Sequence, residues 1–353
     1  MNVLLQLVAT LSLCQEFGQT GWQRMPSLPD SIGFAGMAAG APGDVLIAAG
    51  GARFPGKPPW EGGSKEYDDS IWLLADNLSQ WSRLPQKLHH PLAYAVSATW
   101  KDFLVIAGGE TRASNNAPIT CVEKAFKVRI TDGKANISDL PPIPVPVAYA
   151  TGTVMGSKLM VFGGITSPTA TKALNNLWIL DLADPKNGWV KGLPCPGPAR
   201  ILSVCAAINN NFYIMGGAEL SPDIQGRPSR RYLRDAWRRD SDGNWHRLPD
   251  MPHAVVAAAS PAPISGTRIW ILSGDDGTQV GSLPQAHKGF PGRTMAFDYQ
   301  NNRWVEGRPV PAPRVTLPSV PFRNRWWLIS GESKPGIRSP EVWSADPTVW
   351  ELP

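Results

Sequence analysis

The segment VLIAAGG spans residues 45–51, and close variants of it recur along the chain. Each variant is a short apolar run that ends in Gly-Gly or in Gly followed by an acidic residue. The first glycines of these runs fall at positions 50, 108, 163, 216, 274 and 331, which is nearly even spacing. Even spacing of a 50–60-residue motif is typical of a structural unit repeated along the chain. The other copies are FLVIAGG (103–109), LMVFGG (159–164), FYIMGG (212–217), WILSGD (270–275) and WWLISGE (326–332).

Each unit continues in the same order after its glycines. A loop leads to an apolar strand such as SIWLL (70–74), and then to a strand with Trp and Leu-Pro such as QWSRLP (80–85). A run of small residues such as AYAVSATW (93–100) opens the next unit. Runs of four to eight residues bounded by Gly and Pro, without a long 3.6-residue period, predict an all-β chain. Four antiparallel strands per unit, repeated six times, predict a six-bladed β-propeller with four-stranded blades, in which Trp residues pack between blades.

The sequence signature of the fourth strand occurs seven times, although the glycine-terminated runs define only six units. Both GWQRMPSLP (21–29) and TVWELP (348–353) resemble the fourth strand of the last blade. We predict that residues 21–29 close the ring, because they lead into the first blade with an ordinary loop length. Residues 348–353 would then form an extra edge strand or a tail.

The composition fits a single globular domain. The 353 residues are 42% hydrophobic and 18% charged, with 15 Trp, which argues against global disorder. The net charge of +5 is mild, and the densest basic run (227–239) contains Asp235. We therefore expect no nucleic-acid partner, and a surface that attracts small anions instead. We expect no membrane span, because no apolar segment is long enough.

The first residues form a separate region. The apolar run from Val3 to Leu13 resembles the core of a secretory signal, although no Lys or Arg precedes it. We predict a signal peptide or flexible segment over 1–18, a periplasmic or secreted protein, and one propeller domain over 19–353. A cytoplasmic protein whose N-terminus packs on the domain is the alternative. Cys195 and Cys205 are expected to be small buried residues, or alternatively a disulfide in an oxidising compartment.

Antiparallel geometry predicts which side chains meet. The loop that leaves the second strand and the loop that enters the first strand lie at the same end of a blade. Residues that follow the glycine pairs should therefore converge on the axis with residues that precede each first strand. We predict that Arg53, Glu110, Arg200 and Arg314 bind a polar anionic ligand there. The structural alternative is that the acids bond loop amides and that Arg200 and Arg314 tie neighbouring blades together.

Glu332 and Arg338 flank a Lys-Pro-Gly turn in ISGESKPGIR (329–338), within a loop that needs neither charge. The repeat resembles the Kelch family, and this segment resembles a signature of the bacterial N-acetylneuraminate (sialic acid) mutarotases, which are Kelch propellers. LIAAGGARFPG (46–56), LVIAGGET (104–111) and PVPVAYATG (144–152) resemble further segments of that family. Because the signature segment is last instead of mid-chain, the sequence resembles a circularly permuted member, which a ring tolerates.

The resemblance implies that Glu332 and Arg338 are the catalytic pair of a cofactor- and metal-independent isomerase acting on sialic acid. Mutarotation opens and recloses a sugar ring, which requires proton transfer at the anomeric hydroxyl and at the ring oxygen. An arginine can hold the carboxylate on the anomeric carbon beside the glutamate. Leu92 stands where the family has an arginine, and the loop after Gly51 is rich in proline. These departures concern the identity of the sugar.

Three other functions fit a Kelch propeller. A non-catalytic module would bind carbohydrate or protein over the rim without a specific Glu–Arg pair. A copper radical oxidase would need two Tyr, two His and a Cys around one axis, from only five His and six Tyr in the chain. A mutarotase for another acidic or amino sugar would share the same pair. The sequence leaves open whether the protein is a monomer or a homodimer.

Overall fold

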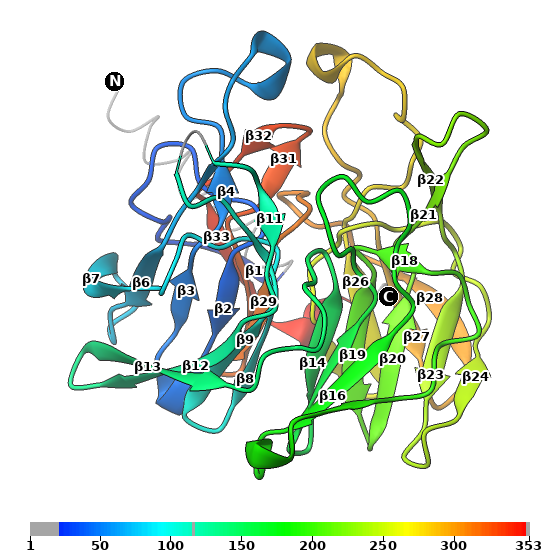
Figure 1. Cartoon of the computed structure of the whole chain (residues 1–353), viewed down its shortest axis with the longest axis horizontal. Helices are drawn as coiled ribbons and strands as arrows, with labels where there is room; N and C mark the ends of the chain where they lie inside the picture. The colour runs from blue at the N-terminus through cyan, green and yellow to red at the C-terminus, as the bar shows by residue number, and fades with distance from the viewer. Residues whose placement is uncertain (1–20, 115–116, 351–353) are drawn as a thin grey trace, which may run out of the picture.

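The computed structural model describes residues 21–114 and 117–350, so the predicted signal segment over 1–18 lies outside the described residues (Figure 1). Within that part of the chain the fold is all-β, and the helical segments are five 3-10 turns of three residues each. No helix of the described part is long and apolar enough to span a membrane. The turns are η1 (Pro42–Asp44), η2 (Pro59–Glu61), η3 (Pro185–Asn187), η4 (Pro284–Ala286) and η5 (Pro347–Val349).

The described strands form six four-stranded antiparallel sheets, as the repeat predicts. The first three follow one another along the chain. They consist of β2 (Ala38–Gly40), β3 (Ile47–Ala49), β6 (Ser70–Leu74) and β7 (Trp81–Lys87); β8 (Val96–Trp100), β9 (Phe103–Ala107), β12 (Ala125–Thr131) and β13 (Lys134–Leu140); and β14 (Thr151–Met155), β15 (Lys158–Phe162), β16 (Leu177–Asp181) and β17 (Trp189–Lys191).

The last three sheets have the same strand order, and the sixth takes its outer strand from the other end of the chain. They consist of β19 (Val204–Ile208), β20 (Asn211–Met215), β23 (Ala236–Arg239) and β24 (Trp245–Arg247); β25 (Ile264–Ser265), β26 (Arg268–Leu272), β27 (Thr294–Asp298) and β28 (Arg303–Gly307); and β29 (Ser319–Phe322), β30 (Arg325–Ile329), β33 (Val342–Ala345) and β1 (Trp22–Met25).

The pairing of β1 with β33 answers the question of the duplicated signature. Trp22 lies opposite Ala345, and Met25 lies opposite Val342. The prediction that the N-terminal copy closes the last sheet is thus confirmed. The second copy turns into η5 instead, where Trp350 is buried and stacks at 5.9 Å on Trp22. Residues 351–353 lie outside the described part.

Side chains alternate between the two faces of a strand, and in inner strands such as β9 both faces are buried. In β9, Leu104 and Ile106 pack in a cluster with the first sheet, whereas Val105 and Ala107 pack in a cluster with the third sheet. The period of two in strand geometry explains this division. It also explains why the inner strands read as continuous apolar runs in the sequence.

Tryptophans of the outer strands join neighbouring sheets, as the sequence predicts. Each of four indole Nε1–H groups donates to a backbone carbonyl 48–55 residues earlier, which is about one repeat before it. The rings pack on apolar neighbours while the polar N–H group is satisfied. The four donors are Trp81, Trp189, Trp245 and Trp304, and the acceptors are Pro26, Pro141, Leu193 and Pro249.

The glycine pairs allow close approach between sheets. Gly108 has a φ of +70°, and a Cβ placed on it would lie 2.4 Å from the carbonyl oxygen of Val147. Gly109 has a φ of +113°, and its N–H donates to that same oxygen at 2.7 Å. A side chain at position 108 would therefore collide with the segment that enters the next sheet.

Six residues that precede the first strands form a ring of backbone hydrogen bonds. All six have a positive φ between 53° and 65°. Each N–H donates to the carbonyl of the corresponding residue one sheet earlier, at 2.7–3.1 Å, and the last bond returns to the first residue. The left-handed backbone conformation directs the N–H and carbonyl groups of these residues around one centre. The six residues are Gly36, Tyr94, Tyr149, Leu202, Ala257 and Thr316.

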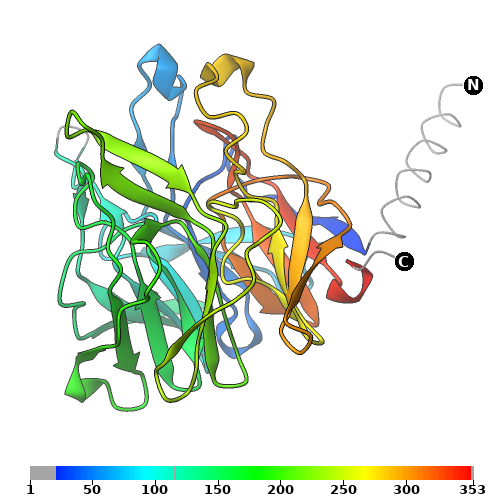
Figure 2. The same ribbon diagram turned by 90° about the vertical axis from the view of Figure 1, so that its right-hand side faces the viewer.

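Four smaller sheets extend from the loops after the glycine pairs and gather at one end of the molecule with the loops that carry η2 and η4 (Figures 1 and 2). This end is where the sequence places the candidate ligand site. The small sheets are β4 (Ala52–Arg53) with β5 (Glu66–Tyr67); β10 (Glu110–Thr111) with β11 (Thr120–Cys121); β18 (Arg200–Ile201) with β21 (Ala218–Pro222) and β22 (Pro228–Tyr232); and β31 (Glu332–Lys334) with β32 (Ile337–Arg338).

Cys195 and Cys205 are both free and buried in the cluster between the third and fourth sheets. The alternative of a disulfide between them is therefore wrong for this structure. Burial raises the pKa of each thiol to about 11, so both remain uncharged at neutral pH.

Candidate active site

The hairpin β31–β32 brings Glu332 and Arg338 together. The two residues lie directly opposite each other in the strand pairing, and Nη1 of Arg338 lies 2.8 Å from Oε2 of Glu332. Gly336, with a φ of +77°, permits the tight turn, and its N–H donates to Oε1 of Glu332 at 2.7 Å. The Lys-Pro-Gly turn therefore folds Arg338 back onto Glu332.

The two members of this pair differ in exposure. The Arg338 side chain is 5% exposed, its Nε donates to the carbonyl of Ala52 at 3.3 Å, and its guanidinium lies 5.1 Å from the ring centre of Phe54. The Glu332 side chain is 16% exposed. Burial raises the pKa of Glu332 above its usual value, although the nearby charge of Arg338 opposes the shift. Glu332 can therefore change protonation closer to neutral pH than an ordinary glutamate.

Glu332 lines a cavity of about 460 Å³ at the end of the molecule that carries the small sheets. This volume lies in the range of sites that hold small molecules. The cavity wall comes from segments far apart in the sequence, so it exists only in the folded chain. Its polar residues are Tyr94, Glu110, Tyr149, Arg230, Thr316 and Glu332, and its apolar residues are Ile165, Pro168, Ala170, Ile201, Leu202, Leu220 and Pro228.

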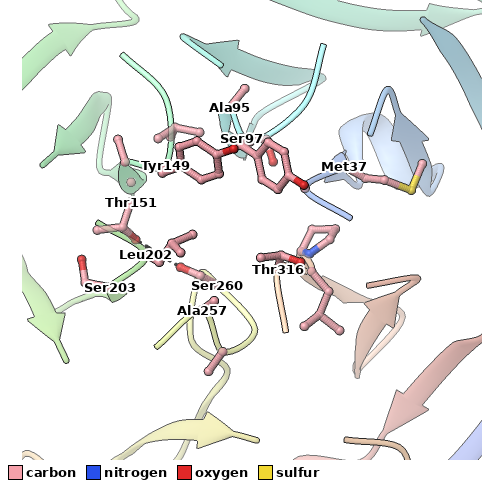
Figure 3. A pocket seen from close by; sticks show the side chains of 18 residues that line it. Met37, Ala95, Ser97, Tyr149, Thr151, Leu202, Ser203, Ala257, Ser260 and Thr316 are labelled. Atoms are coloured by element: carbon pink, nitrogen blue, oxygen red, sulfur yellow. Dashed lines mark hydrogen bonds between the residues drawn. The ribbon is translucent and has the colours of Figure 1, made fainter. Parts of the chain in front are cut away.

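A smaller cavity of about 90 Å³ lies next to the larger one. Figure 3 shows Tyr149, Leu202 and Thr316 converging on it from different sheets, with Thr151 and Ser260 on its wall. Both cavities share the ring residues Tyr94, Tyr149, Leu202 and Thr316. The ring of backbone hydrogen bonds therefore forms the floor of the larger cavity.

Glu110 lies at the same cavity as Glu332 and accepts three side-chain hydrogen bonds on one oxygen. Its Oε2 accepts from Tyr67 Oη at 2.6 Å, from Tyr149 Oη at 2.8 Å and from Lys65 Nζ at 2.9 Å. These three donors fix the position of the Glu110 carboxyl group. The burial of both phenols and the nearby Glu110 raise the pKa values of Tyr67 and Tyr149, so both remain protonated donors.

The ammonium group of Lys65 is held by tyrosines as well as by Glu110. It lies 4.5 Å from the ring centre of Tyr94 and 3.3 Å from the Tyr149 hydroxyl. The Tyr94 and Tyr149 rings stack with their centres 4.5 Å apart. The side chain of Lys65 is only 18% exposed. A positive charge over an aromatic face in a partly desolvated site is favourable, and it fixes the position of Lys65.

Two predicted ligand-binding arginines are structural, which corrects the expectation for Arg200 and Arg314. Arg200 is fully buried and forms a two-pronged pair with Asp235, with Nη1–Oδ1 at 2.9 Å and Nη2–Oδ2 at 2.5 Å. Arg314 is 3% exposed, and its Nη1 donates to the carbonyl of Glu341 at 2.6 Å. Neither residue lines the larger cavity. They tie loops together, which is the structural alternative that the sequence left open.

Arg53, the third predicted ligand-binding arginine, contacts an acid and an aromatic ring. Its guanidinium forms an ion pair with Asp30 and lies 5.1 Å from the ring centre of Phe34. Arg53 is not among the residues that line the larger cavity. The ion pair ties β4 to the segment before β2, and ligand binding by Arg53 stays a prediction.

The remaining acids after the glycine pairs bond loop groups. Glu219 pairs with Arg231 at 2.6 Å, and Asp275 accepts from the Tyr232 hydroxyl at 2.6 Å. Asp276 accepts from the backbone N–H and the hydroxyl of Thr278. Of the acids in this set, Glu110 and Glu332 alone line the larger cavity in the described structure.

Sequence reasoning missed four polar residues of the site. Tyr94 and Tyr149 occur in the two Ala-Tyr-Ala copies that open the second and third sheets, and this shared pattern was a usable signal. Lys65 lies in a loop and Arg230 lies in the additional strand β22, both outside the repeat, so the repeat could not point to them. Within the described residues no group of three or more His, Cys, Asp and Glu side chains is arranged to hold a metal ion.

Comparison with known proteins places this site in context. No protein-family model matches the chain. The chain is 37% identical over 244 residues to the N-acetylneuraminate epimerase of Yersinia enterocolitica, over 62% of this chain and 60% of that protein. It is 26% identical over 236 residues to the N-acetylneuraminate epimerase of Haemophilus influenzae, over 59% of each protein. A Kelch domain-containing protein of Vibrio cholerae is 27% identical over 232 residues, which is 58% of this chain and 62% of that protein.

In these alignments the chain spans 59% to 62% of the length of the curated relatives. The solved structure of YjhT matches over 89% of this chain and 94% of its own, with a TM-score of 0.65 and 15% sequence identity. At that identity the likeness establishes the fold. The chain is therefore a β-propeller related in sequence to bacterial proteins named N-acetylneuraminate epimerase, the family that its ISGESKPGIR segment resembles.

Proposed function

We propose that this protein is a mutarotase that interconverts the α and β anomers of N-acetylneuraminate by opening and reclosing the sugar ring. The observation that carries the proposal is the position of Glu332: a buried carboxyl group with a raised pKa, paired with Arg338, on the wall of a cavity large enough for a sugar. Relatives named N-acetylneuraminate epimerase support the substrate class.

In the proposed reaction Glu332 takes the proton from the anomeric hydroxyl while the ring oxygen is protonated. The carbon–oxygen bond of the ring then breaks, and a carbonyl group forms at the anomeric carbon. Reclosure on the other face of the carbonyl, with the proton transfers reversed, gives the other anomer. General acid–base catalysis of this kind contributes roughly 10²–10⁴-fold to the rate.

Arg338 has two roles in this scheme. It holds Glu332 in place, and it shares its charge with the carboxylate that sialic acid carries on its anomeric carbon. Arg230, at the rim of the same cavity, adds a second positive charge for an acidic sugar. The chemistry requires only proton transfer, so the proposal includes no cofactor.

The proposal extends to the architecture and the location of the protein. We infer that the six sheets are the blades of one closed ring and that the chain is a circular permutation of its relatives. The ring of six backbone hydrogen bonds and the late position of the ISGESKPGIR segment support these inferences. Export to the periplasm rests on residues 1–18 alone, and N-terminal sequencing of protein from fractionated cells would test it.

The test of the proposed function is NMR of freshly dissolved α-N-acetylneuraminate with and without the protein. We expect the protein to accelerate the appearance of the β anomer in proportion to its concentration. Equal rates with and without protein would reject the proposal. Binding without acceleration would favour a non-catalytic carbohydrate-binding module.

A further inference from the structure

Ring opening needs a second proton-transfer group, because Glu332 serves only one of the two oxygens. Glu110 forms a second polar cluster beside this cavity, with Tyr149 and Lys65 as its hydrogen-bond donors. Two of these residues, Glu110 and Tyr149, line the same cavity as Glu332. This inference therefore rests on the proposed function and deepens it.

The hydroxyl of Tyr149 has the contacts of a proton carrier. It donates to Glu110 at 2.8 Å, and the Lys65 ammonium lies within donating distance of the same oxygen, at 3.3 Å. The phenol is therefore held between a carboxylate that accepts and an ammonium that donates. A hydroxyl can rotate toward a bound sugar while its oxygen accepts a proton from a neighbouring donor.

The surroundings fix each member of this group. Tyr149 belongs to the hydrogen-bonded ring at the cavity floor, and its side chain stacks on Tyr94 with ring centres 4.5 Å apart. Lys65 is held by Glu110 and by the face of Tyr94. Such fixed geometry is what general acid catalysis requires, because the donor must already lie within hydrogen-bond reach of its target.

We propose that Tyr149 is the second catalytic residue, that it protonates the ring oxygen of the sugar, and that Lys65 resupplies the proton while Glu110 positions both. In ring opening, the Tyr149 hydroxyl proton moves to the ring oxygen as a Lys65 ammonium proton moves to the Tyr149 oxygen. The ring carbon–oxygen bond breaks, its electron pair stays on the ring oxygen, and Glu332 takes the anomeric hydroxyl proton. Reclosure returns every proton, so no co-reactant is consumed.

The structure offers a matched control for this proposal. Tyr67 and Tyr149 both donate to Oε2 of Glu110, at 2.6 and 2.8 Å, but Tyr67 is not among the residues that line the cavity. Tyr67→Phe and Tyr149→Phe each remove one hydrogen bond to Glu110 and keep the aromatic ring. The two variants differ in whether the lost hydroxyl faces the sugar.

The experiment measures anomer exchange of N-acetylneuraminate against concentration for the wild type, Tyr149→Phe and Tyr67→Phe. We expect Tyr149→Phe to lower kcat by about 10²-fold or more, with KM changed much less, because the hydroxyl acts in proton transfer. Tyr67→Phe should leave both constants within a few-fold of the wild type. If Tyr149→Phe does not fold, Lys65→Met provides a second test. This variant should also lower kcat.

Similar kcat values for the two tyrosine variants, or a Lys65→Met protein with wild-type kcat, would overturn the assignment of Tyr149. In that case a slow Glu332→Gln variant would leave the proposed function standing. A wild-type protein that does not accelerate exchange at all would overturn both proposals together.

Discussion

Two arginine–carboxylate pairs lie in the loops at the same end of the molecule, and they differ in what surrounds the carboxylate. Arg200 and Asp235 form a sealed pair, with side chains 0% and 11% exposed, and Trp237 Nε1 adds a further bond to Asp235 at 2.6 Å. Arg338 and Glu332 are 5% and 16% exposed, and Glu332 lines a cavity. From the sequence, Arg200 was a candidate for ligand binding, and Glu332 with Arg338 was the candidate catalytic pair.

The pKa shifts of the two carboxyl groups have opposite directions. Burial alone would raise the pKa of Asp235, but the hydrogen bonds and charge of Arg200 outweigh it and hold the pKa below its usual value. At Glu332 burial prevails over the charge of Arg338, and the pKa is raised. The lowered pKa favours the ionised form of Asp235, whereas the raised pKa lets Glu332 gain and lose a proton closer to neutral pH. The raised pKa and the adjoining cavity make Glu332, and not Asp235, the candidate for proton transfer.

The largest effect on stability is expected where the sealed pair is broken. Arg200→Met leaves Asp235 as a buried, unpaired charge, and such a loss costs about 3–5 kcal/mol. Urea denaturation of the variant should show this loss, while anomer exchange per folded molecule stays near the wild-type rate. A stable Arg200→Met protein that has lost exchange would mean that Arg200 acts on the ligand after all.

A smaller effect is expected at Arg338, and it is read from the exchange rate per folded molecule. A charge-assisted hydrogen bond contributes about 1.5–3 kcal/mol, which corresponds to roughly 10–150-fold. Arg338→Met should weaken the handling of N-acetylneuraminate by about that factor and change any activity on neutral galactose much less. Arg338→Lys should recover part of the loss, because an ammonium lacks the two-pronged geometry.

The comparison of the two sugars decides what Arg338 does. Exchange rates against concentration for both sugars, with wild type and both variants, supply the measurement. Equal losses on the acidic and neutral sugar would show that Arg338 only positions Glu332. The carboxylate of the sugar would then be bound by Arg230, the arginine on the cavity wall.

The smallest effect is expected at an exposed pair of the same kind. Arg231 is 65% exposed and pairs with Glu219 at 2.6 Å. Because solvent screens such pairs, Arg231→Met should change the free energy of unfolding by about 1 kcal/mol or less, as read from urea denaturation. A change as large as that of Arg200→Met would show that exposure does not separate these pairs.

The fold was largely predictable from sequence, because the repeat encodes it several times over. The glycine-terminated runs, the outer-strand Trp residues and the N-terminal closing strand each appear in the structure where the spacing predicts them. The Glu332–Arg338 pairing was also predictable, since a tight turn joins the two residues.

The rest of the site was not predictable, for two physical reasons. Arg200 and Arg314 each precede a first strand, and the repeat predicts that such residues face the axis. Their hydrogen-bond acceptors, however, lie on neighbouring loops that the repeat does not reveal. Lys65 reaches Glu110 from a long loop with no repeated pattern, so the contact exists only after the first and second sheets pack together. The observed site therefore differs from the predicted one where an irregular loop supplies a residue, and where an arginine pairs with a group that the repeat does not reveal.

The central claim is that Glu332 is catalytic and Asp235 is structural, and one pair of amide substitutions tests it directly. Glu332→Gln and Asp235→Asn would be compared with the wild type for thermal unfolding and for NMR exchange of α-N-acetylneuraminate in the same samples. We predict that Glu332→Gln stays folded at the assay temperature and loses about 10²-fold or more of its exchange rate. Asp235→Asn should unfold at lower temperature and keep its exchange rate per folded molecule. A folded Glu332→Gln protein with the wild-type rate would contradict the account.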